Sequence, residues 1–228
     1  KEIKHVVDEY VDHRLLVPMK NSAIIHNATK PGYSTLDVMR GDKSIHLQCP
    51  DEAYCLIDAE AITIESITAH VYDILRDNLP SNVSGLEITL RHEKIDGAFY
   101  HYTHGLKKHD GNCQRIAHGH RSPVEILVDG NRDAEREEAF AKRWEDIYLG
   151  SKEDVTTLDT LNLSEHAKAV TDESHYAFRY TAPQGEFELA IAKSETEILP
   201  TDTTVELLAG YIADQVKPSL NEGQSLQI

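Results

Sequence analysis

The spacing of three histidines and one cysteine restricts this chain more than any other feature of its sequence. His118 and His120 are separated by one residue, and His104 lies upstream, across a short segment that contains Cys113. Alternate side chains of a β-strand point to the same face, so His118 and His120 would share a face. A neighbouring strand that ends near His104 would bring a third imidazole to them. The chain is therefore predicted to place two adjacent strands here.

Such a set of histidines is typical of a catalytic zinc site. Three neutral imidazoles leave the fourth position of the metal open, whereas structural zinc sites use four protein ligands. The chain contains 13 histidines, so the spacing alone is a weak signal, and His101 and His109 compete with His104 as the third ligand. Cys113 lies in the loop between the histidines, where its thiol would reach a molecule bound to the metal.

The composition limits the classes of molecule that this protein can bind. The chain has 228 residues, of which 40% are hydrophobic and 27% charged, as expected for one large or two small globular domains. A formal net charge of −16 argues against nucleic acids and anionic membranes, which need clustered basic residues. The acidic surplus does not exclude an anionic small substrate, because a local basic exception surrounds the histidines. This exception consists of Lys107, Lys108, Arg115 and Arg121.

The sequence indicates a cytoplasmic location. It contains no secretory signal and no apolar run as long as a membrane span. Three cysteines are an odd number that fits a reducing compartment, and Cys49 and Cys55 are predicted to be core or strand residues. Because the sequence starts at Lys1 and ends at Ile228 inside a strand-like run, we expect further residues beyond both ends.

Hydrophobic periodicity predicts an α+β fold, with helices packed on one side of an antiparallel sheet. Two helices are expected over residues 1–11 and 64–75. A third is expected after an N-cap at Asn131, with Phe140, Trp144 and Ile147 on its core face. A fourth is expected to begin at a capping box formed by Thr203 and Glu206. Strands are expected over 86–90, over 98–101 after a hairpin turn at 94–97, and over 124–128.

A faint internal repeat indicates two related units. Residues 44–49 and residues 186–191 each lead into a predicted helix, and residues 11–15 are similar to residues 173–177. The offset between the copies falls along the chain, because the first copy carries a longer insertion. The sequence therefore predicts two tandem units.

Four segments carry a resemblance to a known family. They are Thr103-His104-Gly105-Leu106, Cys113 with His118-Gly119-His120, Val11-Asp12-His13-Arg14-Leu15, and Leu86 to Glu93. Together they resemble the 6-pyruvoyltetrahydropterin synthase / 6-carboxytetrahydropterin synthase family of the tunnelling fold. The resemblance implies a first tunnelling-fold unit over residues 1–97 and a second, with the zinc-binding segment, over residues 98–228.

The order of these segments differs from that of the family. Family members are usually single units with the zinc segment first, then the Asp-His pair, then the glutamate strand. Here the Asp-His pair and Glu93 precede the zinc segment. The site is then completed either by these residues or by His175 with a residue past Ile228. Family members form rings of units, so a homo-oligomer is expected.

The resemblance implies a zinc-dependent lyase. Its substrate would be 7,8-dihydroneopterin triphosphate, and its product 6-carboxytetrahydropterin, on the queuosine route, or 6-pyruvoyltetrahydropterin. His104, His118 and His120 would bind Zn²⁺.

The remaining site residues follow from the same resemblance. Cys113 would transfer a proton as a thiolate favoured by zinc and the nearby basic residues. Asp12 would orient His13 as a second proton donor and acceptor, and Glu93 would bind the pterin ring through two hydrogen bonds.

Two other functions compete with the synthase. The first is a tunnelling-fold subunit that binds pterins or purines and keeps zinc but has no turnover. It is favoured by the second unit, in which Ser174-His175 stands where an Asp-His pair is expected. An unrelated zinc hydrolase would use a metal-activated water, but the strand-borne His118-Gly119-His120 fits such an enzyme poorly.

Overall fold

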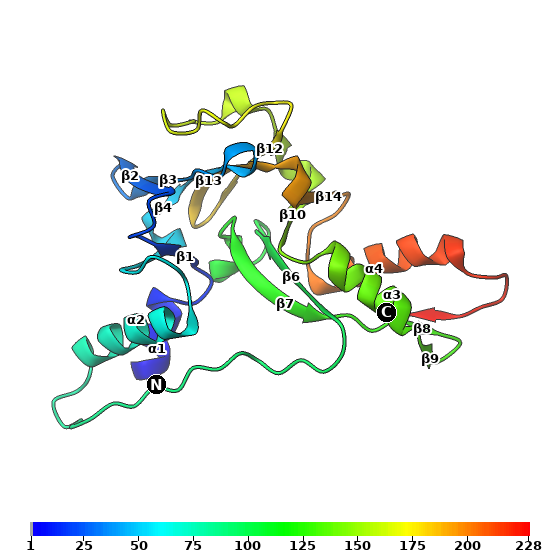
Figure 1. Ribbon diagram of the computed structural model, residues 1–228, viewed down its shortest axis with the longest axis horizontal. Coiled ribbons are helices and arrows are strands. Elements are labelled where there is room, and N and C mark those ends of the chain that lie inside the picture. The colour runs from blue at the N-terminus through cyan, green and yellow to red at the C-terminus, as the bar shows by residue number, and fades with distance from the viewer. Residues whose placement is uncertain (1) are drawn as a thin grey trace.

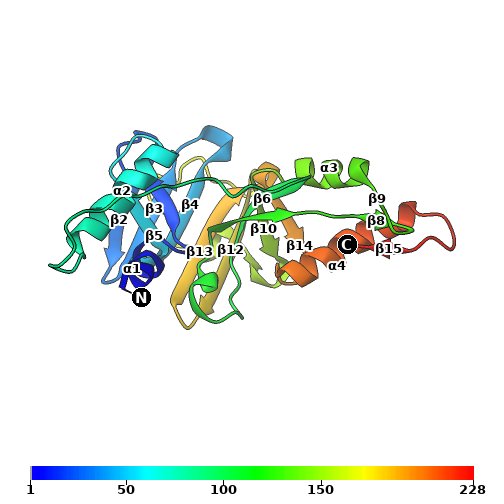
Figure 2. The ribbon, with the colours of Figure 1, turned by 90° about the horizontal axis from the view of Figure 1, so that it is seen from below.

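The computed structural model describes residues 2–228, which form an α+β fold. Its four helices are α1 (Glu2–Tyr10), α2 (Ile64–Asp77), α3 (Ala134–Arg143) and α4 (Val205–Val216). The periodic apolar positions predicted all four regions as helical. Figures 1 and 2 show α1 and α2 at one end of the molecule and α3 and α4 at the other. No helix in residues 2–228 is long and apolar enough to cross a membrane.

A six-stranded antiparallel sheet combines strands from both halves of the chain. Its order is β11-β12-β13-β4-β3-β2. The strands are β2 (Ile24–Lys30), β3 (Tyr33–Val38), β4 (Ile45–Pro50), β11 (Val155–Thr156), β12 (His175–Ala182) and β13 (Gly185–Ala192). The central contact pairs β13 with β4, and Leu47 lies opposite Leu189.

A four-stranded sheet carries the histidines. Its order is β14-β10-β6-β7, and its strands are β6 (Phe99–His104), β7 (His118–Pro123), β10 (Ile147–Ser151) and β14 (Thr196–Leu199). Only β6 and β7 are antiparallel, while β10 runs parallel to both β6 and β14. The expectation of antiparallel sheets alone was therefore wrong. A crossover that includes α3 returns the chain from the β6–β7 hairpin in the direction of β6, which makes β10 parallel to it.

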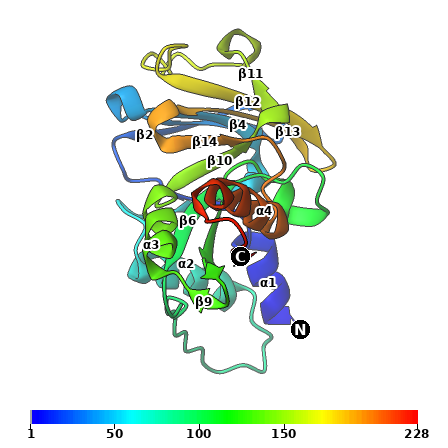
Figure 3. The ribbon, with the colours of Figure 1, turned by 90° about the vertical axis from the view of Figure 1, so that its right-hand side faces the viewer.

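The four-stranded sheet lies between the six-stranded sheet and the helices α3 and α4 (Figure 3). Successive residues of β10 pack to opposite sides: Tyr148 joins the core with Phe178, and Leu149 joins the core with Leu208. The two sheets approach closely at Gly150, where a Cβ atom would lie 2.3 Å from the ring of Phe178. The smaller strands are β1 (Leu15–Pro18) paired with β5 (Tyr54–Ile57), and β8 (Leu127–Val128), β9 (Asn131–Arg132) and β15 (Leu226–Gln227) in a third sheet.

The predicted strand over residues 86–90 does not form. Residues 78–98 run as an extended link from α2 to β6 without a paired strand, so the predicted hairpin is also absent (Figure 1). Leu86 and Ile88 are half-buried and alternate with exposed residues, as the pattern predicted. A strand also needs a neighbour to bond its backbone, and no described strand pairs with this segment.

Three predicted boundaries also moved. The strand expected over residues 124–128 is reduced to β8, although Val124 and Ile126 are buried as predicted. Helix α3 begins after Asp133 rather than Asn131, because the Asp133 carboxylate accepts a hydrogen bond from the Arg136 N–H. Ile147, expected in that helix, opens β10 instead.

Candidate metal centre

The β6–β7 hairpin brings three imidazoles to one face. Its register places His104 opposite His118 and Tyr102 opposite His120. The ring centroids of His104 lie 4.6 Å from His118 and 4.8 Å from His120, and the last two are 5.0 Å apart. One nitrogen from each ring lies within 4.8 Å of the others. The three histidines predicted as ligands are therefore close enough to bind one metal ion.

In two of these rings, one nitrogen has no hydrogen-bond partner among the described residues. The Nδ1–H of His118 donates to the carbonyl of Arg115 at 2.7 Å, which leaves Nε2 as an unprotonated acceptor. Nδ1 of His104 lies 2.7 Å from the Thr203 hydroxyl. Both Nε2 atoms are buried and have no hydrogen-bond partner among the described residues. Buried polar atoms are normally paired, and metal-binding histidines are normally held through their second nitrogen, so these residues fit a zinc ion.

Burial keeps these imidazoles neutral. Loss of solvent lowers the pKa of His104 to about 2 and that of His118 to about 3, and neighbouring histidines contribute. Burial also lowers the pKa of His120. Because a metal binds the unprotonated nitrogen, the cluster needs no deprotonation to bind zinc at neutral pH.

The metal-free protein should therefore lose stability on acidification. Unfolded histidines take up protons below their ordinary pKa of 6.5, whereas folded His104 and His118 stay neutral until their lowered values are reached. Falling pH then favours the unfolded state. From about pH 7.5 to about pH 5.5, the two residues should cost about 2–3 kcal/mol of unfolding free energy. Urea denaturation at both pH values measures this. We expect His118→Asn to reduce this loss of unfolding free energy and the exposed His5→Ala to leave it unchanged. Equal stability at both pH values would contradict the assignment of His104 and His118 as buried, neutral imidazoles.

Thr203 is a site residue that the sequence did not reveal as one. It was expected to cap α4, but Thr204 occupies the N-cap position and no side chain caps the helix. The buried Thr203 hydroxyl contacts His104 instead. In a sequence, a threonine just before a helix is interpreted as a helix cap. The contact of Thr203 with His104 depends on how α4 packs against β6, which the sequence does not show.

Thr203→Val should weaken zinc binding by about 10-fold to 100-fold, because His104 loses the group that orients its ring. Competition with a chromophoric chelator measures this affinity. Exposed Thr201→Val is the matched control and should bind zinc as the natural chain does. An unchanged affinity in Thr203→Val would show that the hydroxyl does not support the ligand.

Asp12 and His13 lie beside the cluster although they are distant in sequence. The His13 ring centroid lies 5.1 Å from that of His118, and its Nδ1 lies 2.6 Å from the Asp12 carboxylate. The buried Arg115 guanidinium donates to the Asp12 carbonyl at 3.0 Å, which fixes this segment against the β6–β7 loop. His13 has a left-handed backbone with φ of 54°, uncommon for a residue other than glycine. These contacts position a carboxylate–imidazole pair beside the histidine cluster.

Cys113 lies on the same side, in the loop between β6 and β7. Its sulfur and one nitrogen each from His13 and His118 lie within 4.8 Å of one another. Its carbonyl accepts a hydrogen bond from the Leu106 N–H at 2.8 Å. Gln114, the next residue, is held by the β12–β13 hairpin, because the Tyr180 hydroxyl donates a hydrogen bond to its carbonyl at 2.6 Å.

The expected activation of the thiol by nearby basic side chains is absent. Lys107 pairs with Asp154 and Lys108 with Glu153, so neither charge is directed to the sulfur. Burial, with a contribution from Asp12, raises the pKa of Cys113. The protein residues alone therefore favour the thiol, and a thiolate would need the metal charge.

The other predicted residues lie in different places. Glu93 is exposed in the link between α2 and β6, where it lines a pocket together with His120. His175 is buried away from the cluster, with Nε2 bonded to the Ser44 carbonyl at 2.8 Å. His109 is exposed, and His101 lies on the opposite face of β6 from His104.

One of the comparisons with known proteins gives a match, and it covers the region that contains the histidine cluster. A family model described as 6-pyruvoyl tetrahydropterin synthase matches residues 96–228, more than half of the chain. No curated protein and no solved structure matches the chain significantly. The matched region contains the three histidines and Cys113. The chain therefore belongs to the 6-pyruvoyl tetrahydropterin synthase family.

Proposed function

We propose that this protein is a zinc-dependent pterin synthase. It would convert 7,8-dihydroneopterin triphosphate to 6-pyruvoyltetrahydropterin with loss of triphosphate, or to 6-carboxytetrahydropterin with uptake of water and loss of both triphosphate and the two outer side-chain carbons as a two-carbon aldehyde. This proposal is carried by the buried Nε2 atoms of His104 and His118, which have no partner among the described residues and lie beside Cys113 and His13 in a chain of this family. A histidine cluster with a thiol and a second proton carrier is suited to proton transfer on a metal-bound substrate.

Each residue has a distinct part in this proposal. Zinc bound by the three histidines would polarise the side-chain oxygens of the substrate and acidify the adjacent C–H. Cys113 would accept that proton, and its half-buried position would limit exchange with water. His13, held by Asp12 at 2.6 Å, would return a proton to the next carbon. Glu93 would bind the amino-pyrimidinone edge of the pterin.

The proposal extends to the organisation of the chain. Residues 1–97 and 98–228 would be two tunnelling-fold units, and chains would assemble as a homo-oligomeric ring in the cytoplasm. Strands β4 and β13, which carry the repeat, support two units because they pair antiparallel with Leu47 opposite its repeat equivalent, Leu189. Such a pairing is expected when two copies are related by a local twofold axis.

The test of the proposed function combines metal analysis with turnover. Purified protein would be analysed for zinc per chain and then incubated with 7,8-dihydroneopterin triphosphate, with mass analysis of the products. Stoichiometric zinc with triphosphate release supports the synthase, and the product mass identifies the branch. Zinc with pterin binding but no turnover supports the binding subunit. Absence of stoichiometric metal in protein never exposed to chelator contradicts the proposed site.

A further inference from the structure

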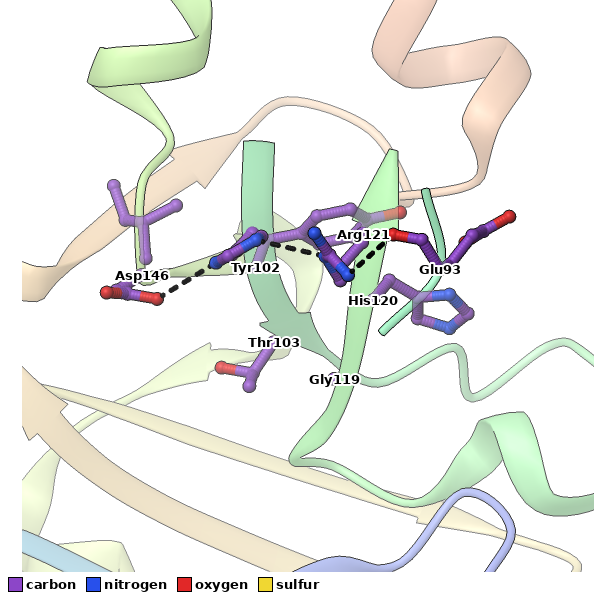
Figure 4. A pocket seen from close by; sticks show the side chains of 9 residues that line it. Glu93, Tyr102, Thr103, Gly119, His120, Arg121 and Asp146 are labelled. Carbon is purple, nitrogen blue, oxygen red and sulfur yellow. Dashed lines mark hydrogen bonds and ion pairs between the residues drawn. The ribbon is translucent and has the colours of Figure 1, made fainter. Parts of the chain in front are cut away.

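A pocket lies along the edge of the hairpin that carries the histidine cluster. It has a volume of about 670 Å³ and is lined by residues of β6, β7 and the start of β10, together with Glu93. β7 is the edge strand of its sheet. His120 and Arg121 are neighbours on this strand, so their side chains point to opposite faces, and both line the pocket (Figure 4). The pocket therefore extends around the strand edge from a metal ligand to a guanidinium group.

Arg121 is the basic residue near the cluster whose charge remains available. Lys107 and Lys108 are each paired with carboxylates. Arg115 is buried and donates to the backbone carbonyl groups of Asp12 and His13. Arg121 forms no ion pair with any described carboxylate, although the chain has a net charge of −16.

The guanidinium is held in a fixed orientation by a chain of contacts. Its Nε donates to Nε2 of His101 at 3.1 Å, so the proton of this imidazole lies on Nδ1, which faces the Asp146 carboxylate at 3.4 Å. Its carbon lies 4.8 Å from the centre of the Phe99 ring. Dashed lines in Figure 4 trace these contacts from Asp146 to Arg121 and on to the Glu93 carbonyl.

This arrangement leaves the terminal nitrogens for a ligand. The only hydrogen bond that they make among the described residues is a long one, 3.4 Å from Nη1 to the Glu93 carbonyl. A half-buried guanidinium fixed through Nε presents a planar pair of donors, which matches two oxygens of a phosphate group.

We propose that Arg121, oriented by His101 and Asp146, binds the phosphate groups of the substrate across the edge of β7. This inference rests on the proposed function, because it assigns the anionic tail of the same substrate. The hydroxyl side chain would lie at the metal face and the phosphates would bend around the strand to Arg121. Arg121 would be a binding residue, and His101 a positioning residue that acts through it.

The first test measures anion binding without turnover. The purified full chain would be titrated calorimetrically with inorganic tripolyphosphate and, separately, with inorganic phosphate. We expect Arg121→Gln to weaken tripolyphosphate binding by about tenfold or more, and Arg121→Lys to restore part of it. Exposed Lys168→Gln removes the same charge elsewhere and should bind as the natural chain does. Equal binding by Arg121→Gln and the natural chain would overturn the proposal.

Two further arms identify where the anion binds. Binding that persists after zinc removal and still depends on Arg121 supports the proposed site, whereas binding lost with zinc and insensitive to Arg121→Gln places the anion on the metal and overturns it. Tripolyphosphate binding well above that of inorganic phosphate supports a site for a phosphate chain, and equal affinities would reduce it to a site for free phosphate and overturn the substrate assignment. Thermal unfolding would confirm that each variant is folded.

Turnover separates this inference from the proposed function. If the chain is a synthase, Arg121→Gln should raise KM for the triphosphate substrate by about tenfold and leave kcat nearly unchanged. His101→Ala should raise KM less, because the charge remains but its orientation is lost. Unchanged KM in an active Arg121→Gln enzyme would overturn the inference and leave the synthase intact. Tripolyphosphate binding that depends on Arg121, without any turnover, would keep the anion site at Arg121 and overturn the synthase.

Discussion

His118→Ala should abolish stoichiometric zinc binding and, with it, triphosphate release. His118 has the strongest structural claim to be a ligand: its Nδ1–H is fixed on the Arg115 carbonyl, and its buried Nε2 has no partner among the described residues. It also belongs to both groups of potential ligand atoms, the one with His104 and His120 and the one with His13 and Cys113. We expect zinc affinity to fall by more than ~100-fold, beyond the effect of losing an outer partner.

Metal analysis after gel filtration and a chelator competition would measure this loss. His5→Ala is a suitable control, because His5 is exposed on α1 and should leave zinc content unchanged. Circular dichroism would show that His118→Ala is folded in the absence of metal. If His118→Ala retained zinc at the natural stoichiometry, the metal would lie elsewhere and the proposed chemistry would lose its basis.

The part of the site that local sequence could predict is the β6–β7 hairpin. The alternation of Tyr102 and His104 on one strand, and of His118 and His120 on the next, determines which side chains share a face as soon as the strands pair. The register depends on the same alternation, since a slip of one residue would direct the imidazoles to the opposite face. This is why His118 and His120 could be placed on one face from the sequence alone, whereas the choice of His104 over His101 and His109 followed the family resemblance.

Residues that reach the site from distant segments were harder to assign. Thr203 looked like a helix cap, and its contact with His104 depends on how α4 packs against β6. Asp12 and His13 were identified only through a family resemblance, because no local pattern places them beside a loop that is a hundred residues away. Arg115 holds them there through backbone carbonyls, an interaction that a sequence does not display.

The failed strand prediction has a different physical cause. The alternation of Leu86 and Ile88 was read correctly as a two-sided pattern, and those side chains are half-buried. Periodicity reports which face of a segment is apolar but not whether another strand is available to pair with it. The parallel pairing of β10 with β6 was missed for a related reason, since strand direction depends on the connection between strands.

Cys113→Ala should lower kcat by about 10²-fold to 10⁴-fold while zinc content and pterin binding stay close to those of the natural chain. The thiol lies near His13 and His118, and Cys113 is a free, half-buried cysteine. Its loss should therefore remove a proton carrier without disturbing the ligands. Cys113→Ser should be nearly as slow, because a hydroxyl is far less acidic than a thiol.

Single-turnover kinetics with 7,8-dihydroneopterin triphosphate, together with metal analysis of each variant, would measure this effect. Asp110→Ala, an exposed change in the same loop, is the matched control and should retain both zinc and rate. Because burial raises the pKa of the Cys113 thiol in the metal-free chain, zinc loading should increase its reactivity toward a small alkylating reagent at neutral pH. A Cys113→Ala enzyme that kept more than about a tenth of the natural rate would remove Cys113 from the proton transfer and leave His13 as the remaining candidate.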